Sequence, residues 1–371
     1  MRVLHLLGAT EDDGGILTVL RGLATQHAPS ECYHVVWVHR SYREIRRPHL
    51  EYRPSRWFLG EPDNHWSLGL RSLPAILELA RLQQRERYDL LHLHARGGLL
   101  IAPLIPRLLR QPILFTNHGY ANRVEIYRWA MRRQAVHTVL LSPAMVRHYG
   151  AAALPRVSVI SACCQERFFE APLVTRRTSP QGPLRLVGVG NVVAWKNWHL
   201  VLEALLQLTV EERARVRFDH FGPVPDTPPC RAYAERLRRL RSELGNGVTF
   251  HGPSHQIVEV LREADWFVLP STNEPCSVAL IEALALGLPA LASASGGNVD
   301  IIHNARTGLL FEPNSVTSLA QRLRAILHHP VPPAAPEEMR ETVRQRGAPA
   351  VAAEYLALYR RLLAEAISSR A

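Results

Sequence analysis

Lys196, in the stretch AWKNW (194–198), is the only lysine among the 44 lysine and arginine residues of this chain. A compact ammonium on a flexible stem fits a narrow phosphate pocket, which a wide planar guanidinium would fit poorly. A drift of codon usage from lysine to arginine is the alternative, and it explains the arginines better than the remaining lysine. Lys196 follows the apolar run LRLVGVG (184–190), which has the pattern of a buried strand. Because ligands of parallel sheets bind beyond the carboxyl ends of strands, Lys196 is a candidate phosphate ligand.

A second polar group lies in the stretch STNEPCSVALIEALALG (271–287). Ser277 is placed to cap a helix that Gly287 would end. The N-terminus of such a helix offers free backbone N–H groups and suits a phosphate. Glu274 precedes that terminus and Glu282 lies inside the helix, so the two carboxylates could bind hydroxyls on either side of the phosphate. Compensation of the helix dipole by Glu274, and a solvated helix face for Glu282, remain open alternatives.

Two glycine patterns also bear on ligand binding. Gly296-Gly297 follow a predicted strand, where they would allow a backbone to approach a ligand closely, although an ordinary tight turn is the commoner explanation. Gly188 and Gly190 begin a GxGxxG pattern that would need a glycine where Val193 stands. A Rossmann site for NAD is therefore not supported.

The elements that must position these residues alternate between strands and helices. In the first part of the chain, strands are predicted at 3–8, 33–39, 89–94, 113–118, 138–142 and 157–161, helices at 14–26 and 71–87, and a polar, proline-rich loop around 40–66. After a proline-rich stretch, strands recur at 184–190, 215–222, 248–252, 266–270, 289–293 and 308–313, with helices at 198–208, 230–243, 255–264 and 277–287. This rhythm is typical of βαβ units on parallel sheets.

The chain of 371 residues is longer than one hydrophobic core of roughly 250–300 residues usually supports. We expect an α/β protein with two Rossmann-like domains that face a cleft. The predicted boundaries are 1–172 for the first domain, 173–183 for a linker, 184–349 for the second domain and 350–371 for a C-terminal helix.

Composition narrows the class of protein. The hydrophobic content of 47% is that of a globular protein, and no apolar run approaches the roughly 20 residues of a membrane-spanning helix. We find no signal-peptide core and five cysteines without a CxxC pair, so we expect a cytoplasmic protein with reduced thiols. The net charge of +11 favours contact with the anionic inner face of a membrane over nucleic acid, because no basic patch interleaved with aromatic residues is present.

The run from Gly188 to Phe311 resembles the retaining glycosyltransferases of the group-4 type (GT4), a large family with the two-domain GT-B fold. The resemblance rests on the loop ending in Lys196-Asn197, the spacing Glu-x7-Glu at Glu274 and Glu282, and the following Gly296-Gly297 and TGLLF. The first half matches more weakly, in Gly14-Gly15, YDLLHLH (88–94), FTNHG (115–119) and LSPAMVRHYG. In this family the C-terminal helix crosses back to the first domain.

The resemblance implies a nucleotide-diphosphate sugar of the UDP or GDP type as donor, without a further cofactor. It implies Lys196, Glu274 and His118 as the catalytic residues: Lys196 contacts the diphosphate, Glu274 the donor sugar, and His118 the transferred sugar near the acceptor. The donor-binding residues that it implies are Gly15, Gly190, Asn191, Lys196, Ser277, Val278 and Glu282, with the ribose on Glu282. A histidine that merely satisfies its hydrogen bonds at a strand end remains the alternative for His118.

The reaction implied is transfer of a sugar to a glycan, lipid or other glycoconjugate, with retention of configuration and without a metal. His92 and His94 share one face of their predicted strand but lack a visible third ligand. Asn191 stands where many members have an arginine, a second cation for the diphosphate. This departure favours an alternative function, a weakly active or inactive scaffold that binds nucleotide sugars.

Overall fold

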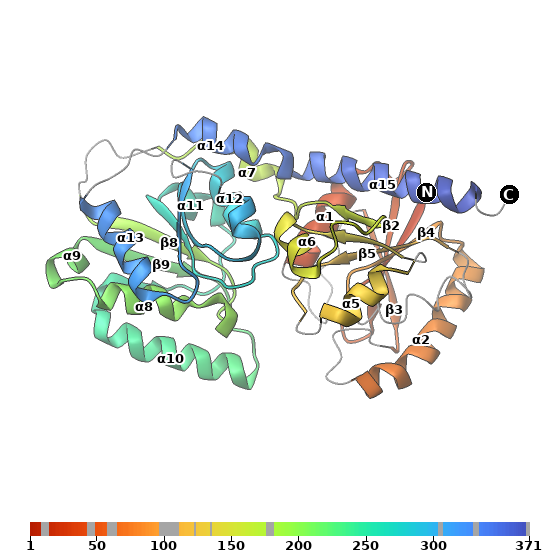
Figure 1. Ribbon diagram of the computed structural model, residues 1–371, viewed down its shortest axis with the longest axis horizontal. Helices are drawn as coiled ribbons and strands as arrows, with labels where there is room; N and C mark the ends of the chain where they lie inside the picture. Colours follow the sequence, from red (N-terminus) through yellow and green to blue (C-terminus); the bar gives the residue numbers. More distant parts are fainter. Residues whose placement is uncertain are drawn as a thin grey trace. The chain divides into compact units, whose positions relative to one another are not determined.

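The computed structural model describes residues 1–8, 15–42, 49–57, 65–95, 111–121, 124–133, 136–175, 182–302, 307–328 and 334–368. The chain forms two compact units, Met1–Cys164 with Arg346–Ala371, and Gln165–Gln345 (Figure 1). Each unit is described by itself.

The boundary between the units differs from the predicted limits of 172 and 184 because the segment after Cys164 is bonded to the second unit. The backbone N–H of Val174 donates to the carbonyl of Leu286 at 2.9 Å. Arg340 Nη2 donates to the carbonyl of Ala171 at 2.7 Å. The proline-rich stretch chosen as a linker therefore begins within the second unit, and its residues 176–181 lie outside the described part of the chain.

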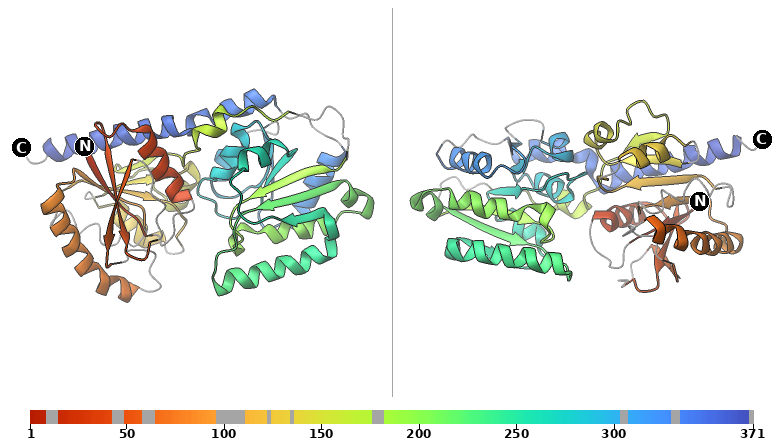
Figure 2. Two further views of the ribbon diagram at one scale, coloured as in Figure 1. Left: turned by 180° about the vertical axis from the view of Figure 1, so that it is seen from behind. Right: turned by 60° about the horizontal axis from the view of Figure 1, so that its bottom comes forward.

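The first unit contains a parallel sheet of order β3-β2-β1-β4-β5-β6-β7. Its strands are β1 (Arg2–Leu6), β2 (Tyr33–His39), β3 (Leu50–Ser55), β4 (Leu90–Leu93), β5 (Ile113–Asn117), β6 (Val136–Leu140) and β7 (Val157–Val159). Its helices are α1 (Gly15–Gln26), α2 (His65–Glu86), α5 (Val124–Met131), α6 (Pro143–Tyr149) and α15 (Ala348–Ser368). Figure 2 shows α1 and α15 on one side of this sheet and α2 on the other.

The two faces of the sheet differ because successive side chains of a strand point to opposite sides. Leu4 of β1 and Val35 of β2 pack with Ile76 of α2 in a buried cluster. Val36 of β2 packs instead with Leu20 of α1. Removing such side chains from water stabilises the unit by about 1.5–3 kcal/mol each.

The prediction of a loop around 40–66 was wrong in part. Residues Leu50–Ser55 form β3, which pairs in parallel with β2 at the edge of the sheet. An edge strand has only one hydrogen-bonded neighbour, so it tolerates Pro54 and its polar residues, which had hidden it in the sequence. Helix α2 also begins earlier than predicted, at His65. Helices α5 and α6 were not predicted.

The second unit contains a parallel sheet of order β10-β9-β8-β11-β12-β13. Its strands are β8 (Leu184–Val189), β9 (Val216–Phe221), β10 (Val248–Phe250), β11 (Trp266–Leu269), β12 (Ala290–Ser293) and β13 (Gly308–Phe311). Its helices are α7 (Glu166–Glu170), α8 (Trp198–Leu206), α9 (Val210–Ala214), α10 (Pro228–Leu244), α11 (Ile257–Arg262), α12 (Val278–Ala285), α13 (Val316–His328) and α14 (Pro336–Thr342). Helices α7, α9, α13 and α14 were missed in the sequence.

Helices α8, α10 and α13 pack together on one face of this second sheet (Figure 1). The core of this face forms where Leu186 of β8 and Phe218 of β9 meet the fully buried Trp198 of α8. Helix α12 lies on the other face with α7 and α14. The prediction of two parallel-sheet domains is confirmed, and each carries helices on both faces of its sheet.

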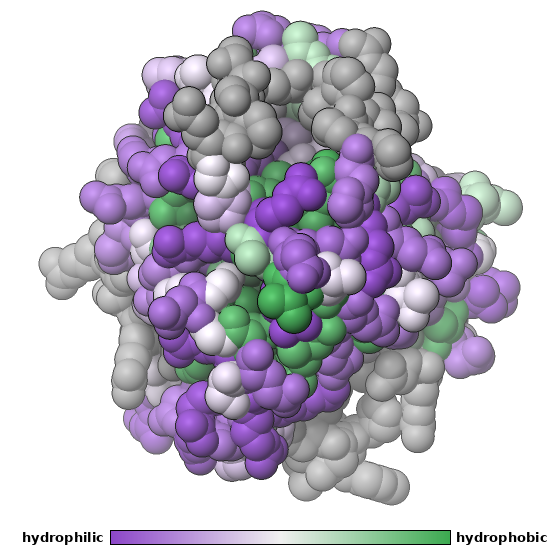
Figure 3. Space-filling model, turned by 90° about the vertical axis from the view of Figure 1, so that its left-hand side faces the viewer, coloured by the Kyte–Doolittle hydropathy of each residue, from purple (hydrophilic) through white to green (hydrophobic). Residues whose placement is uncertain are grey.

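The surface and the helices bear on contact with membranes. Within the described residues, no helix is both long enough and apolar enough to span a bilayer. The face shown in Figure 3 is mostly hydrophilic, with smaller apolar areas between the polar side chains.

Candidate active site

The ammonium of Lys196 forms an ion pair with the carboxylate of Glu274. Lys196 Nζ donates to Glu274 Oε2 at 2.8 Å, and the two side chains are only 12% and 10% exposed. The same ammonium lies 4.6 Å from the ring centroid of Trp195, which is itself half exposed. The structure therefore joins two predicted catalytic residues and adds an aromatic ring that we had not singled out. In the sequence, the one feature that could have indicated Trp195 is its position next to the single lysine.

Two polar loops hold Lys196 at the carboxyl end of β8. The loop after Gly190 tightens into a short 3₁₀ turn over Ala194–Lys196, and Asn197 follows in the left-handed conformation with φ of 56°. The amide Nδ2 of Asn197 donates to Asn314 Oδ1 at 3.1 Å and to Thr272 Oγ1 at 3.3 Å. These bonds fix the backbone from which Lys196 extends.

Gly190 and Asn191 lie at the start of the same loop. A Cβ on Gly190 would meet Cε of Lys196 at 3.6 Å, an ordinary van der Waals contact, and the φ of 150° at this position favours glycine. The carbonyl of Asn191 accepts a hydrogen bond from Trp198 Nε1 at 3.0 Å. Asn191 thus has a structural contact through its backbone, while its side chain carries no charge toward an anion.

The Gly296-Gly297 turn supports Glu274 through its backbone. Gly297 N–H donates to the carbonyl of Glu274 at 2.7 Å. Gly296 has φ of +56°, and a Cβ there would lie 2.3 Å from that carbonyl oxygen. The approach to a ligand that we predicted for these glycines stays a prediction, whereas the approach that the structure shows is to the backbone of Glu274.

Helix α12 begins four residues after Glu274, at Val278. Ser277 is its N-cap, with Oγ accepting from the backbone N–H of Leu280 at 3.3 Å. Within the described residues, the backbone N–H groups of Ser277 and Val278 have no hydrogen-bond acceptor. The structure thus pairs the largely buried ammonium of Lys196 with a carboxylate that lies three residues before this free N-cap, an arrangement that suits a diphosphate.

Glu282 lies inside α12 and differs from a carboxylate on a solvated face. It keeps some exposed surface, yet burial raises the pKa of its carboxyl group to about 8. The opposing influence is the positive charge of Arg167 on α7, which lowers this pKa less than burial raises it. A carboxyl group with a raised pKa in such a position is a candidate for hydrogen bonding to ligand hydroxyls.

The other two predicted residues, Gly15 and His118, belong to the first unit. Gly15 is the first residue of α1, and Gly14 lies outside the described part of the chain. His118 directly follows β5, and its Nε2 lies 3.1 Å from Nδ1 of His94. Burial lowers the pKa of His118 to about 3, so this imidazole is neutral at pH 7.

Two groups in the described residues bring possible metal ligands within 4.8 Å of one another. They are His5 with His92 and His94, and His27 with Cys32 and His34. The third histidine that the sequence had not revealed beside His92 and His94 is thus His5, from the neighbouring strand β1. The ring nitrogens of His92 already bond to Tyr359 and Thr116, at 2.8 Å each.

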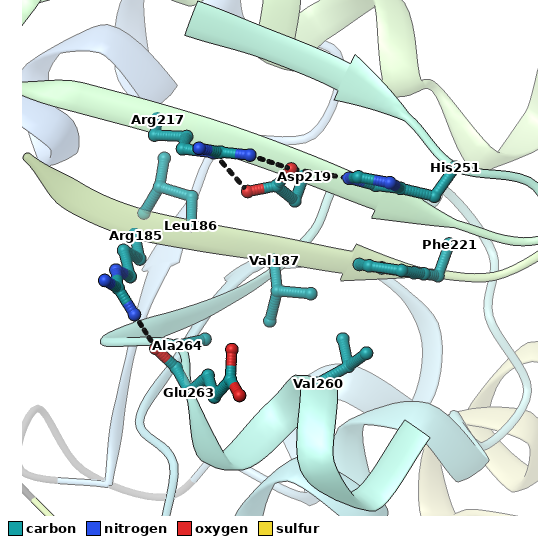
Figure 4. A pocket seen from close by; sticks show the side chains of 10 residues that line it. All are labelled: Arg185, Leu186, Val187, Arg217, Asp219, Phe221, His251, Val260, Glu263 and Ala264. Atoms are coloured by element: carbon teal, nitrogen blue, oxygen red, sulfur yellow. Dashed lines mark hydrogen bonds and ion pairs between the residues drawn. The ribbon is translucent and has the colours of Figure 1, made fainter. Parts of the chain in front are cut away.

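A cavity of about 300 Å³ lies between β8, β9 and α11 (Figure 4). On one wall, Asp219 accepts from Arg217 Nε at 2.8 Å and lies 2.6 Å from His251 Nε2. The ring of His251 stacks on Phe221 with centroids 4.5 Å apart. None of the predicted site residues lines this cavity, so it is separate from the Lys196–Glu274 pair.

Comparison with known proteins covers both units. Residues 175–347 match the family "Glycosyl transferases group 1", and residues 13–163 match "Glycosyltransferase Family 4". The crystal structure of a glycosyltransferase from Rickettsia africae is similar over 98% of both chains, with a TM-score of 0.79 and 18% identity. Anabaena Alr3699/HepE in complex with UDP is similar over 100% of both chains, with a TM-score of 0.71 and 17% identity. The fold is that of GT-B proteins.

Two relatives are similar in sequence. The 2-deoxystreptamine glucosyltransferase of Streptomyces kanamyceticus is 27% identical over 290 residues, which are 70% of this chain and 73% of that protein. The putative colanic acid biosynthesis glycosyltransferase WcaL of Escherichia coli K12 is 32% identical over 157 residues, 40% of this chain and 37% of WcaL. The chain belongs to the group-4 type of GT-B glycosyltransferases, which confirms the resemblance seen in its sequence.

Proposed function

We propose that this glycosyltransferase moves a sugar, with retention of configuration and without a metal, from a nucleotide-diphosphate sugar to a glycan, lipid or other glycoconjugate. The observation that carries the proposal is the pairing of Lys196 with Glu274 next to the free N-terminus of α12. A cation and backbone N–H groups neutralise charge on a departing diphosphate.

Different residues of the second unit bind different parts of the donor. Lys196 and the backbone N–H groups of Ser277 and Val278 bind the diphosphate, and Gly190 leaves room for it. Glu282 bonds the ribose hydroxyls, and Glu274 bonds the donor sugar while it orients the ammonium. A nucleotide of the UDP type is supported by the Anabaena protein, whose structures contain UDP and UDP-glucose.

The first unit takes the acceptor side. His118 contacts the transferred sugar, and Gly15 at the start of α1 contacts phosphate. In this arrangement the leaving diphosphate helps to deprotonate the acceptor, so the enzyme positions the reactants and stabilises charge instead of supplying a nucleophile.

The experiment is a thermal-shift panel of UDP, GDP, ADP and their sugar conjugates. One matching nucleotide at about 100 times its Kd stabilises the native state by about 2.7 kcal/mol. The mutant protein Lys196→Ala in the same panel shows whether the shift depends on the proposed site. No shift with any nucleotide sugar in the wild-type protein would contradict the proposal.

Asn191 favours a second candidate function, a nucleotide-sugar-binding scaffold without turnover, because a neutral side chain stands where an arginine is common. Donor hydrolysis in the absence of acceptor separates the two. An active transferase releases nucleotide diphosphate slowly, whereas the scaffold binds the donor and releases none.

The net charge of +11 supports attachment to the anionic inner surface of a membrane, where a lipid-linked acceptor would be met. Flotation with vesicles tests this. Binding that requires anionic lipid and weakens with salt is expected, and equal recovery with neutral vesicles would remove this part of the proposal.

A further inference from the structure

Five imidazole rings in the first unit form a continuous hydrogen-bonded line, here called the histidine chain. The contacts are His118 Nε2 to His94 Nδ1 at 3.1 Å, His94 Nε2 to His5 Nδ1 at 3.0 Å, His5 Nε2 to His34 Nδ1 at 2.8 Å, His34 Nε2 to His27 Nδ1 at 3.0 Å, and His27 Nε2 to the carbonyl of Ala352 at 2.9 Å. The chain thus connects the proposed site residue His118 to the backbone of α15.

The alternation of side chains along parallel strands produces this line. His34, His5 and His94 come from β2, β1 and the end of β4, which are neighbours in the sheet, and His118 follows the next strand, β5. All of them belong to the face covered by α1 and α15, since the residues between them pack with α2 on the opposite face. His27 lies just after α1 and completes the line.

The five contacts of the line need one hydrogen each, so one N–H per ring, as in neutral imidazoles, satisfies all of them. Burial lowers the pKa of His34 to about 3 and places the pKa values of His5 and His94 well below their usual value. Burial also lowers the pKa of His27, against the opposing influence of its hydrogen bond to the carbonyl of Ala352. A neutral imidazole has one donor and one acceptor nitrogen, so every contact in the chain must pair a donor with an acceptor.

The carbonyl of Ala352 fixes the direction of these bonds because it has no hydrogen to give. His27 must therefore donate to it from Nε2, which leaves His27 Nδ1 as an acceptor. His34 must then donate from Nε2 to His27, and the same reasoning passes through the next two rings. At the far end, His118 donates from Nε2 and keeps the lone pair on Nδ1.

We infer that the histidine chain fixes His118 as its Nε2–H tautomer, so that His118 Nδ1 is a hydrogen-bond acceptor in the active site. The buried rings are positioning residues that act through His118. In a neutral imidazole, the hydrogen bond made by one ring nitrogen determines whether the other nitrogen carries the proton.

This inference deepens the proposed function and rests on it for one consequence. The group that meets His118 Nδ1 must carry a hydrogen, as a sugar hydroxyl does. A phosphate oxygen or a carbonyl oxygen would face a lone pair and be repelled. His118 therefore selects for a hydroxyl at this point of the substrate, and it does not bind the diphosphate.

The test is a nitrogen NMR measurement on the full-length protein, with the histidine rings isotopically labelled and the His118 signals assigned by their loss in the variant His118→Asn. At neutral pH, we expect a pyrrole-type signal from His118 Nε2 and a pyridine-type signal from Nδ1. A protonated Nδ1, a mixed tautomer or a charged ring in the wild-type protein would overturn the inference, whatever the variants do.

Three variants test whether the histidine chain sets the tautomer of His118. In His34→Phe the chain is cut, so His5, His94 and His118 can all reverse their tautomers and His118 becomes a mixture. His34→Gln restores the direction, because its amide N–H₂ must face His27 and its oxygen then accepts from His5. His137→Phe is the matched control: this histidine is buried in the same sheet but bonds Ser158 at 2.8 Å, outside the chain.

The expected loss of kcat/KM is about tenfold in His34→Phe, the worth of roughly one hydrogen bond in the transition state. His34→Gln and His137→Phe keep the wild-type activity per folded molecule. An unchanged His118 tautomer in folded His34→Phe would overturn the inference. So would stoichiometric metal in the purified protein, because a metal would replace ring protons.

The NMR result is independent of turnover. If His118 has the expected tautomer and no glycosyl transfer is found with any donor, the proposed function is wrong while the inference about the histidine chain is confirmed. If the protein transfers a sugar but His118 has the other tautomer, the inference about the histidine chain is wrong while the proposed function is confirmed.

Discussion

Lys196 Nζ and Glu274 Oε2 lie 2.8 Å apart although 78 positions separate the two residues in the sequence. The pair is electrically neutral as a whole, so it does not by itself attract an anion. Because an ammonium has three N–H donors, Lys196 can keep Glu274 and still donate to a phosphate oxygen. Glu274 then acts both as a partner that orients Lys196 and as an acceptor for a sugar hydroxyl.

Replacing Lys196 tests this pair directly. Lys196→Ala should lower kcat/KM by about two orders of magnitude, the range for losing one preorganised charge contact. Lys196→Arg should also be impaired, because the wide guanidinium must fit beside Gly190 and Glu274. Arg238→Ala, on the exposed surface of α10, is the control and should leave kcat/KM unchanged. Normal activity in Lys196→Arg would reduce the lone lysine to an accident of codon usage.

Gly296→Ala should displace Glu274. Its Cβ would lie 2.3 Å from the carbonyl oxygen of Glu274 at a backbone φ of +56°. Gly252→Ala is the matched control, because Gly252 has φ of +77° but nothing within 4 Å of a Cβ. The control should lose about 1–2 kcal/mol from backbone strain alone. In denaturant unfolding and steady-state kinetics, Gly296→Ala should lose more stability and also kcat/KM; equal behaviour of both variants would contradict the role of the turn.

The raised pKa of Glu282 predicts that the stability of the protein depends on pH. Its pKa rises from 4.5 to about 8 on folding, so between these values the folded state holds a proton that the unfolded state releases. The contribution is fully present below pH 4.5 and is lost as the pH rises through 8. Glu282→Gln should therefore raise the Tm relative to the wild type at pH 9, with a difference that shrinks toward pH 5. A difference that is constant over this range would show that Glu282 has an ordinary pKa.

The N-cap of α12 should combine stability with binding. Ser277→Ala removes the bond to Leu280 N–H and should cost about 1 kcal/mol in the free energy of unfolding. Thr209→Ala removes the equivalent cap of α9, where Thr209 Oγ1 accepts from Glu212 N–H, and should cost a similar amount. Nucleotide titration by calorimetry should show weaker binding only for Ser277→Ala. Equal affinity in both variants would show that the Ser277 cap does not position these N–H groups for the donor.

Much of the site was visible in local patterns. The cap at Ser277, the left-handed Gly287 beyond α12 and the loop position of Lys196 were all predicted, because each depends on residues close in sequence. The edge strand β3 was missed since its polar residues and Pro54 lack the alternation that marks a half-buried strand. Helix α13 was missed despite an apolar face whose buried residues are Leu319, Ala320, Leu323 and Ile326.

The side-chain partnerships depended on the fold. Neighbouring strands of a parallel sheet come from distant segments, so no spacing in the sequence shows that His5 meets both His34 and His94. The same holds for Glu282, because the burial that raises its pKa is a property of the folded unit.

Local patterns therefore predicted most of the strands, the cap of α12 and the candidate residues Lys196 and Glu274, because propensity, alternation and capping act over a few residues. The resemblance to the family added His118. Tertiary structure alone decided that Lys196 pairs with Glu274, that Gly296 supports the backbone of Glu274, and that His118 ends a line of buried imidazoles. The physical reason is that hydrogen bonds, desolvation and close contacts depend on distances in space, which only the packed sheets establish.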